Sequence, residues 1–216
     1  MSDGLLAEMP AQRRDPEETR RRILEAATAE FAQRGLSGAR VDEIAARTKT
    51  TKRMIYYYFE SKERLYLAVL EKAYRDVRSD EQSIRLDDLA PEEALRALVG
   101  FTFDRDNTHP DFIRLVCGEN INRGEYIAQL ASLQKLNIPI LVTLARILER
   151  GRAAKLFAAD VEAIELHFMI SALCFFSVSN RHTFSTIFGY DMTSAQSAAR
   201  RRRIITDMIL SYVKSG

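Results

Sequence analysis

The chain has 216 residues, of which 46% are apolar and 29% charged, and it contains nine glycines and five prolines. This composition excludes a disordered chain, and the length allows one compact unit or two closely packed ones with a sizeable core. Cys117 and Cys174 lie far apart, without a His or Cys at metal-ligand spacing, so we expect reduced thiols and no metal or other cofactor. No secretory signal is visible, and the longest apolar run, residues 168–178, is too short to span a bilayer. We therefore expect a cytoplasmic protein without a membrane partner.

Positive charge is concentrated in the N-terminal third of the chain. Residues 11–78 contain 16 Lys and Arg against 11 Asp and Glu, whereas residues 79–216 contain 16 against 17. This asymmetry points to a polyanionic partner for the first third, although a solvated helical surface would carry the same excess.

Helix signals begin at residue 15. The preceding residues, 1–14, have no apolar periodicity, and we expect them to form a flexible tail. Asp15 is placed to cap a helix that starts at Pro16 and ends at Gly35. Three further helices are predicted over residues 41–47, 52–60 and 62–77, the last two capped by Thr51 and Ser61.

Helical spacing continues through the rest of the chain. A polar stretch over residues 79–88 is predicted to be a joint. Helices are predicted over residues 91–108, 112–118, 125–150, 160–178 and 194–213, with a kink or break at Pro139 and a helix end at Gly151. No strand period and no internal repeat is present. The predicted fold is all-α with about nine helices, an N-terminal three-helix unit followed by a larger helical bundle.

Residues 41–60 have the form of a helix-turn-helix, the element that places its second helix in the major groove of DNA. The second helix and its flanks carry Lys, Arg, Thr and Tyr side chains. Hydroxyl groups and cations bind phosphates, and Arg and Lys also match the O6 and N7 atoms of guanine. The residue types therefore predict a DNA-binding surface.

The segment over residues 23–67, and above all VDEIAARTKTTKRMIYYYFESKERL over residues 41–65, resembles the DNA-binding domain of TetR-family repressors. Two positions depart from the family pattern: Lys49 occupies the turn where Gly is usual, and Glu60 stands where Pro is common. The resemblance implies a helix-turn-helix domain over residues 15–62, a connecting helix over 63–80, and a ligand-binding and dimerisation domain over 81–216.

Carried over by position, the resemblance implies that Lys52, Arg53 and Met54 reach base edges. The predicted DNA-binding residues are Arg40, Lys49, Thr51, Lys52, Arg53, Met54, Tyr56, Tyr57, Tyr58 and Lys62. Arg40 is included on its charge and position alone, and Tyr58 could equally pack in the core beside Phe59. Phosphate neutralisation should make binding to double-stranded DNA steeply dependent on salt.

TetR-family proteins pair through their last two long helices, so the resemblance implies a homodimer formed by residues 160–178 and 194–213. A two-fold dimer places two recognition helices on one face of DNA and predicts a palindromic operator. The four arginines at 200–203 are interpreted as a solvated or interface face, with a second DNA site as the alternative.

The family places a small-molecule pocket among the middle helices, and polar groups on apolar stretches are its markers in the sequence. The candidate ligand-binding residues are Phe112, Leu115, Glu119, Asn120, Asn122, His167, Ser171 and Phe175. Each could instead be a helix cap, a satisfied core group or an interface contact. The effector itself is not identified.

The sequence as a whole predicts a transcriptional repressor that a small molecule releases from its operator. The alternatives are an activator and a DNA-binding protein of weak specificity. An enzyme is not expected, because the three histidines are scattered and no phosphate-cradling glycine loop, nucleophile elbow or metal spacing is present.

Overall fold

The computed structural model describes residues 15–158 and 160–215, so the predicted tail over residues 1–14 lies outside the described residues. Its described part is helical and contains no strand, as predicted. The α-helices are α1 (Pro16–Gly38), α2 (Val41–Thr48), α3 (Lys52–Phe59), α4 (Lys62–Gln82), α5 (Pro91–Thr108), α6 (Pro110–Ile121), α7 (Ser132–Ala153), α8 (Ala163–Ser179), α9 (Arg181–Phe188) and α10 (Ala195–Lys214). Two short 3₁₀ helices, η1 (Leu86–Asp88) and η2 (Ile127–Gln129), lie between them.

The starts of α1, α3 and α4 were predictable because capping is local. Asp15 accepts a hydrogen bond from the backbone N–H of Glu17 at the start of α1. The Thr51 hydroxyl accepts from Met54 N, and Ser61 caps α4 in the same way. Each side chain satisfies a backbone donor that the first turn of a helix leaves without a partner.

The helix break predicted at Gly35 is present, since this residue has φ 65° and ψ 174°, but the chain re-enters helix and α1 ends at Gly38. Another predicted helix end was wrong. The polar joint predicted over residues 79–88 is instead the last turn of α4 followed by η1. The extra turn is held by the buried ion pair of Arg78 with Glu81 and by burial of Val77.

In the C-terminal part, the structure differs from the predicted helix bounds. Pro139 lies inside α7, which is continuous from residue 132 to 153, and the expected earlier start is taken up by η2. Gly151 lies within α7 rather than closing it. Residues 160–162 precede α8, whose N-cap is Glu162 rather than Asp160, and α9 was not predicted at all.

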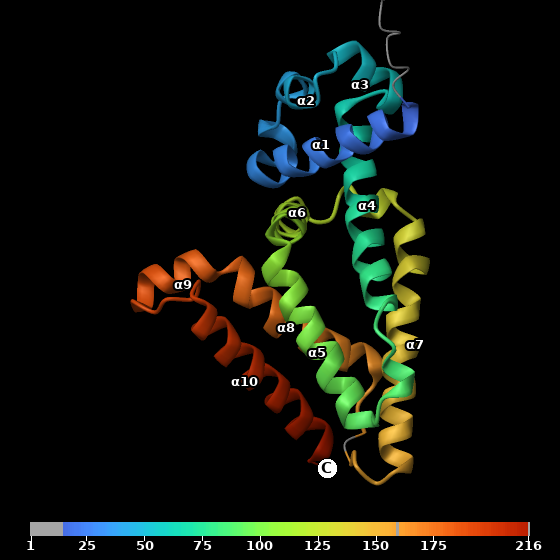
Figure 1. Cartoon of the computed structure of the whole chain (residues 1–216), viewed down its shortest axis with the longest axis vertical. Helices are drawn as coiled ribbons and strands as arrows, with labels where there is room; N and C mark the ends of the chain where they lie inside the picture. Colours follow the sequence, from blue (N-terminus) through green and yellow to red (C-terminus); the bar gives the residue numbers. More distant parts are fainter. Residues whose placement is uncertain (1–14, 159, 216) are drawn as a thin grey trace, which may run out of the picture.

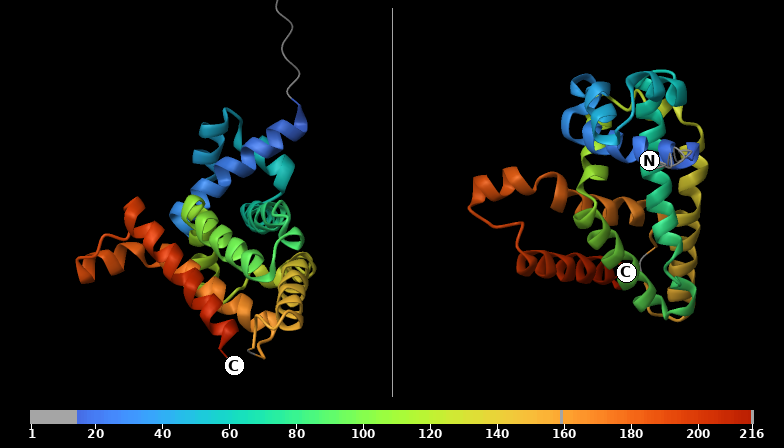
Figure 2. Two further views of the ribbon diagram at one scale, coloured as in Figure 1. Left: turned by 60° about the horizontal axis from the view of Figure 1, so that its bottom comes forward. Right: turned by 45° about the horizontal axis from the view of Figure 1, so that its top comes forward.

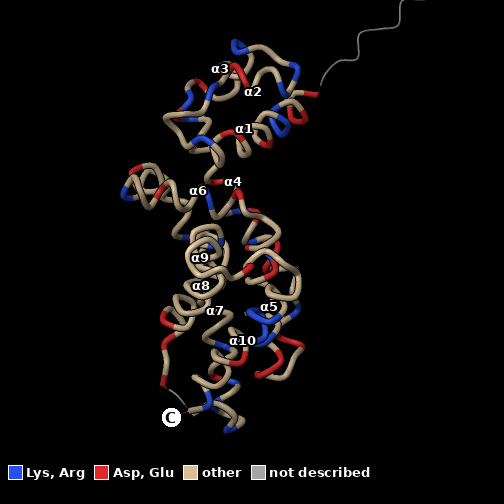
Figure 3. The backbone as a smooth tube through the Cα atoms, turned by 90° about the vertical axis from the view of Figure 1, so that its left-hand side faces the viewer, with Lys and Arg blue, Asp and Glu red and all other residues tan. Residues whose placement is uncertain are grey.

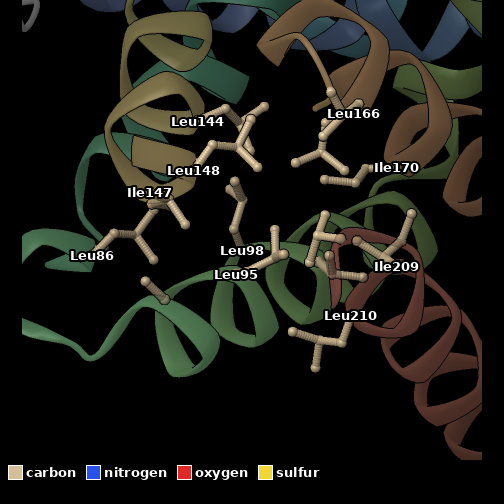
Figure 4. Packing of buried hydrophobic residues seen from close by; sticks show 14 of the residues in the cluster. Leu86, Leu95, Leu98, Leu144, Ile147, Leu148, Leu166, Ile170, Ile209 and Leu210 are labelled. Atoms are coloured by element: carbon tan, nitrogen blue, oxygen red, sulfur yellow. The ribbon is translucent and has the colours of Figure 1, made fainter. Parts of the chain in front are cut away.

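The helices pack around two hydrophobic clusters. The N-terminal cluster joins α1, α2 and α3 to the first half of α4 and includes Leu115 from α6. The C-terminal cluster joins α5, α7, α8 and α10, and Figure 4 shows Leu95 and Leu98 of α5 pointing toward Leu144 and Leu148 of α7. Because α4 and α6 reach both parts, the two clusters are coupled through packing.

The arrangement is elongated. In Figure 1 the helices α1, α2 and α3 lie at one end, and α4 runs from them alongside α7 toward the opposite end. Both views in Figure 2 show α9 projecting sideways from the bundle, next to the start of α10. Within the described residues no single helix is long and apolar enough to cross a membrane, although α8 and α9 together pass that test across a 66° bend.

Candidate nucleic-acid interface and ligand cavities

The turn between α2 and α3 is shaped by a left-handed residue. Lys49 has φ 51° and ψ 39°, and its backbone N–H donates to the carbonyls of Ala45 and Ala46. This is the conformation that glycine adopts most easily, and a non-glycine residue there costs roughly 1 kcal/mol. Lys49 therefore keeps the turn geometry that Gly would give, and its side chain is exposed.

Helix α3 has one buried and one exposed face. Ile55 and Phe59 are buried in the N-terminal cluster. Lys52 and Arg53 are exposed, as are Met54, Tyr56 and Tyr57, the last with 77% of its surface accessible. Burial of Ile55 and Phe59 fixes the rotation of the helix and so directs the cationic and hydroxyl groups outward. Figure 3 shows Lys and Arg positions at this end of the molecule, opposite the C-terminus.

Three of the predicted DNA-binding residues also form hydrogen bonds or ion pairs within the protein. The Thr51 hydroxyl caps α3, and the Lys62 ammonium donates to the Ser37 carbonyl oxygen at 3.3 Å. Lys52 lies 3.4 Å from the Asp42 carboxylate, and both side chains are about half exposed. Such surface pairs are weak, so a phosphate can replace Asp42 as the partner of Lys52.

Tyr58 and Arg40 sit at the edges of this surface. Tyr58 is half-buried against the N-terminal cluster and packs edge-to-face on Tyr57 with ring centroids 5.4 Å apart. Its side chain therefore has a packing role and can also support Tyr57. Arg40 is exposed and precedes α2, where its backbone N–H donates to Glu30.

Glu30 is a positioning residue that sequence reasoning missed. Its side chain is fully buried and forms ion pairs with Arg34 at 3.2 Å and Arg47 at 3.1 Å. Together with the Arg40 backbone N–H, these contacts join α1 to both ends of α2. The signal was present in the sequence, because residue 30 falls on the apolar stripe of α1 between Ala27 and Phe31.

The eight residues predicted to bind a ligand do not line one cavity. Leu115 and Asn122 line a groove of about 600 Å³ between α1, α6 and the junction of α8 with α9. Phe112 lines a separate cleft of about 420 Å³ between α4 and the junction of α5 with α6. The carboxamide of Asn120 donates to the Val116 carbonyl of its own helix and is exposed.

Glu119 is buried and forms hydrogen bonds within the protein. Its carboxylate, 1% exposed, accepts hydrogen bonds from the Tyr66 hydroxyl at 2.8 Å and from Ile127 N at 2.9 Å. Burial and this carboxylate both raise the pKa of Tyr66, so the phenol remains protonated and acts as the donor. Glu119 thus connects α4 and α6 to the chain around η2.

His167, Ser171 and Phe175 lie at half-buried positions on α8 and line neither of these two cavities. Burial, together with the nearby charge of Arg78, lowers the pKa of His167 and favours its neutral form.

A buried ionic cluster between α4 and α5 was also missed by sequence reasoning. Arg78 pairs with Glu81, and Arg105 pairs with Asp80 at 3.3 Å. Burial raises the pKa of Asp106 to about 6, against the opposing effect of the two arginines. The guanidinium of Arg105 also lies over the Phe112 ring, 5.2 Å from its centroid.

An apolar face on α8, α9 and α10 remains exposed. It includes Ile164, Phe168, Phe176, Ile187, Phe188, Ile204, Met208 and Tyr212. The groove between the three helices has a volume of about 780 Å³ and is lined mainly by Phe, Leu, Ile and Met side chains. Exposed apolar surface of this extent is typical of a protein–protein interface.

Models of known protein families match both the N-terminal and the C-terminal part of the chain. Residues 23–69 match the family described as bacterial regulatory proteins, tetR family, and residues 91–209 match the tetracyclin repressor-like C-terminal domain. The HTH-type transcriptional repressor NicS of Pseudomonas putida is 38% identical over 192 residues, which cover 89% of this chain and 91% of NicS.

Two further relatives come from Streptomyces coelicolor. The HTH-type transcriptional repressor SCO4008 is 39% identical over 111 residues, covering 51% of this chain and 54% of SCO4008. The crystal structure of the transcriptional regulator SCO4942 has a TM-score of 0.68 and 26% identity, covering 90% of this chain and 97% of that one. The prediction of a DNA-binding regulator rather than an enzyme is confirmed. The chain belongs to the TetR family of bacterial transcriptional regulators.

Proposed function

We propose that this chain is a dimeric repressor that binds a palindromic operator and leaves it when a small molecule binds. The observation that carries the proposal is the outward face of α3, where Lys52, Arg53 and Tyr57 are exposed while the opposite side of the helix is buried. A rigidly held helix with a cationic, hydroxyl-bearing outer face has the chemistry and shape that the major groove requires.

Dimerisation through α8 and α10 supports the palindromic operator. The exposed apolar side chains of the two helices, among them Phe168 and Met208, would be buried against the same side chains of a second copy. The two-fold axis would then place two copies of α3 about one helical turn apart on the DNA.

The effector is proposed to act by changing how α6 packs under the DNA-binding helices. Leu115 on α6 belongs to the N-terminal cluster, and Glu119 on the same helix accepts a hydrogen bond from Tyr66 on α4. A ligand that binds better to one position of α6 than to another would favour one separation of the two α3 helices.

The test is footprinting on the DNA that flanks the gene for this chain. We expect one or a few discrete, symmetric protected sites, with affinity that falls steeply as salt rises from 50 to 200 mM. A scrambled duplex of the same length and base composition is the control. Uniform protection of all DNA at similar concentrations would contradict a sequence-specific repressor.

A further inference from the structure

The groove between the DNA-binding helices and the C-terminal helices has an apolar wall. Phe31 and Leu36 of α1 line one side, and Ile113 and Ile121 of α6 line another. The α8–α9 junction closes the third side with Val178. The volume of about 600 Å³ is in the range of small-molecule sites. Since α1 and α6 both contribute, any occupant touches both parts of the protein.

The same groove carries positive charge at the α8–α9 junction. Arg114 and Arg181 both line it, and burial lowers the pKa of Arg181, as do the charges of Arg114 and Arg201. The Arg181 Nε donates to the Val178 carbonyl at 3.3 Å, whereas its buried Nη2 has no hydrogen-bond partner among the described residues. Arg201 lies near Arg181 but lines the apolar groove between α8, α9 and α10 instead.

The carboxylates near the groove already have partners. Asp111 pairs with Arg114 at 2.9 Å, and both side chains are substantially exposed. Glu119 does not line the groove, and its buried carboxylate accepts hydrogen bonds from the Tyr66 hydroxyl and from Ile127 N. A buried guanidinium N–H without an acceptor is costly, and an anionic oxygen is the acceptor that binds it most strongly.

We propose that this groove binds a small organic anion with an apolar body. The anionic group would accept hydrogen bonds from Arg181, and the apolar body would lie against Phe31, Ile113 and Val178. The proposal rests on the proposed function, because this anion would be the effector. It would act by separating α1 from α6. Gly35 lines the groove, and its positive φ interrupts α1. Helix α1 can therefore bend at Gly35 when the anion binds.

Cys117 provides a measurement of occupancy that needs no DNA. Its thiol lines the groove and is half-buried, whereas Cys174 has no exposed surface. The alkylation rate of Cys117 by a maleimide therefore reports the groove. The probes are octanoate, octanamide, octylammonium and acetate, which separate the contribution of the charge from that of the apolar chain. We expect octanoate to slow alkylation at least tenfold at saturation and the other three to have little effect at equal concentration.

Two variants test the residues that carry the proposal. Arg181→Gln should weaken octanoate protection at least tenfold, while the exposed Arg200→Gln leaves it unchanged. Gly118 lines the groove, and a Cβ built there would lie 3.9 Å from the nearest atom, the Tyr66 hydroxyl oxygen. Gly118→Leu should therefore fill the groove and abolish protection, whereas Gly118→Ala should retain it. Thermal melts of the unliganded variants show that each is folded.

The outcomes are distinguishable. Equal protection by octanoate and octanamide, or unchanged octanoate protection in both Arg181→Gln and Gly118→Leu, would overturn the proposed anion site. Failure of octanoate to protect Cys117 in a protein that binds its operator would also overturn it. Protection by octanoate in a protein that binds no duplex specifically would support the groove and contradict the proposed repressor function.

Discussion

Glu30 and Glu119 are carboxylates buried at junctions between helices. Glu30 joins α1 to both ends of α2, and Glu119 joins α4, α6 and the chain near η2. Both side chains are almost completely buried, so they act by positioning other residues. A buried carboxylate is tolerated only where several donors surround it, and each of these has at least two.

Replacing Glu30 should weaken the DNA-binding end of the protein. Glu30→Ala leaves the Arg40 backbone N–H without its acceptor and removes the shared partner of Arg34 and Arg47. We expect a loss of about 3 kcal/mol in the free energy of unfolding, measured by urea denaturation. The exposed Glu25→Ala is the matched control and should change it by less than about 0.5 kcal/mol. Equal effects of the two changes would remove the positioning role of Glu30.

Arg53 is the residue for which base readout can be tested most directly. Its side chain is exposed on α3 and makes no contact that holds the fold. Arg53→Ala should reduce operator affinity by roughly 1 to 3 kcal/mol and relax the base preference at one position of each half-site. Gel-shift titration against a set of single-base operator variants measures both effects.

Arg75→Ala is the control for that experiment, since Arg75 is exposed on α4 and pairs with Glu71. Operator affinity in Arg75→Ala should match that of the unchanged protein. If Arg53→Ala bound every operator variant with the original preferences, Arg53 would have no part in base recognition.

The exposed face of α3 was predictable from the sequence because the motif is local. Burial of Ile55 and Phe59 fixes which side of α3 faces outward, and both lie within eight residues of the side chains that they position. The candidate ligand residues depend on how distant helices pack. Leu115 and Glu119 look alike in the sequence as markers of a pocket, yet Glu119 is held by Tyr66, 53 positions away.

At the scale of helices, α9 was missed because its sequence is a poor helix former. It contains Thr183, Thr186 and Ile187, which are β-branched. Its helical form is supported by packing, since the Phe184 ring contacts the rings of Phe176 and Phe188. Those contacts come partly from α8 and could not be derived from residues 181–188 alone.

The extra turn of α4 has a similar origin. Arg78 and Glu81 are both nearly buried, and α5 supplies the neighbouring Arg105. A run of polar residues reads as a loop when its burial is unknown, so the sequence predicted a joint there. The observed result is a continuous α4 that runs from the N-terminal cluster and packs against α7.

Gly151 in α7 permits a close approach of the chain that follows. A Cβ at this position would overlap Cδ2 of Phe157, a buried ring of the C-terminal cluster. Gly151→Ala should displace the ring and lower the free energy of unfolding by about 1 to 3 kcal/mol. At Gly38 the added Cβ would meet Arg34 Cβ at an ordinary 3.5 Å, so Gly38→Ala is the control and should be nearly neutral. Differential scanning calorimetry compares the two.

For the whole molecule, the ionic cluster between α4 and α5 predicts how stability depends on pH. Burial raises the pKa of Asp106 from 3.8 to about 6, so between these values the folded protein holds a proton that the unfolded chain has released. The stabilising contribution of protonated Asp106 is therefore complete below pH 4 and is lost as the pH rises through 6.

Asp106→Asn removes this titration. The stability of the variant relative to the unchanged protein should rise between pH 4 and pH 6.5, by on the order of 1 to 3 kcal/mol. Denaturation at a series of pH values measures the difference, and the exposed Asp88→Asn should show no such trend. A difference between the Asp106 variant and the unchanged protein that is constant across this pH range would mean that Asp106 does not titrate there.

The apolar face on α8 and α10 predicts the assembly state. Phe168 is 66% exposed, so Phe168→Glu should leave the core intact and disrupt association of two chains by burying unpaired like charges in their interface. Sedimentation equilibrium should show a dissociation constant raised on the order of 100-fold. Ile138→Glu, at an exposed apolar position of α7, is the control. A Phe168→Glu protein that stayed dimeric would exclude this face as the interface.

Leu115 has a consequence for protein engineering. This α6 side chain is 2% exposed and belongs to the hydrophobic cluster of α1, α2, α3 and α4. The N-terminal helices therefore depend on a residue from a later part of the chain to complete their core. A chimera that grafts residues 15–82 onto another regulator would lack Leu115 and leave a cavity in the N-terminal cluster. Such chimeras should regain stability only when residues 110–130 are grafted as well. Operator specificity can then be transferred to another sensor domain only together with that segment.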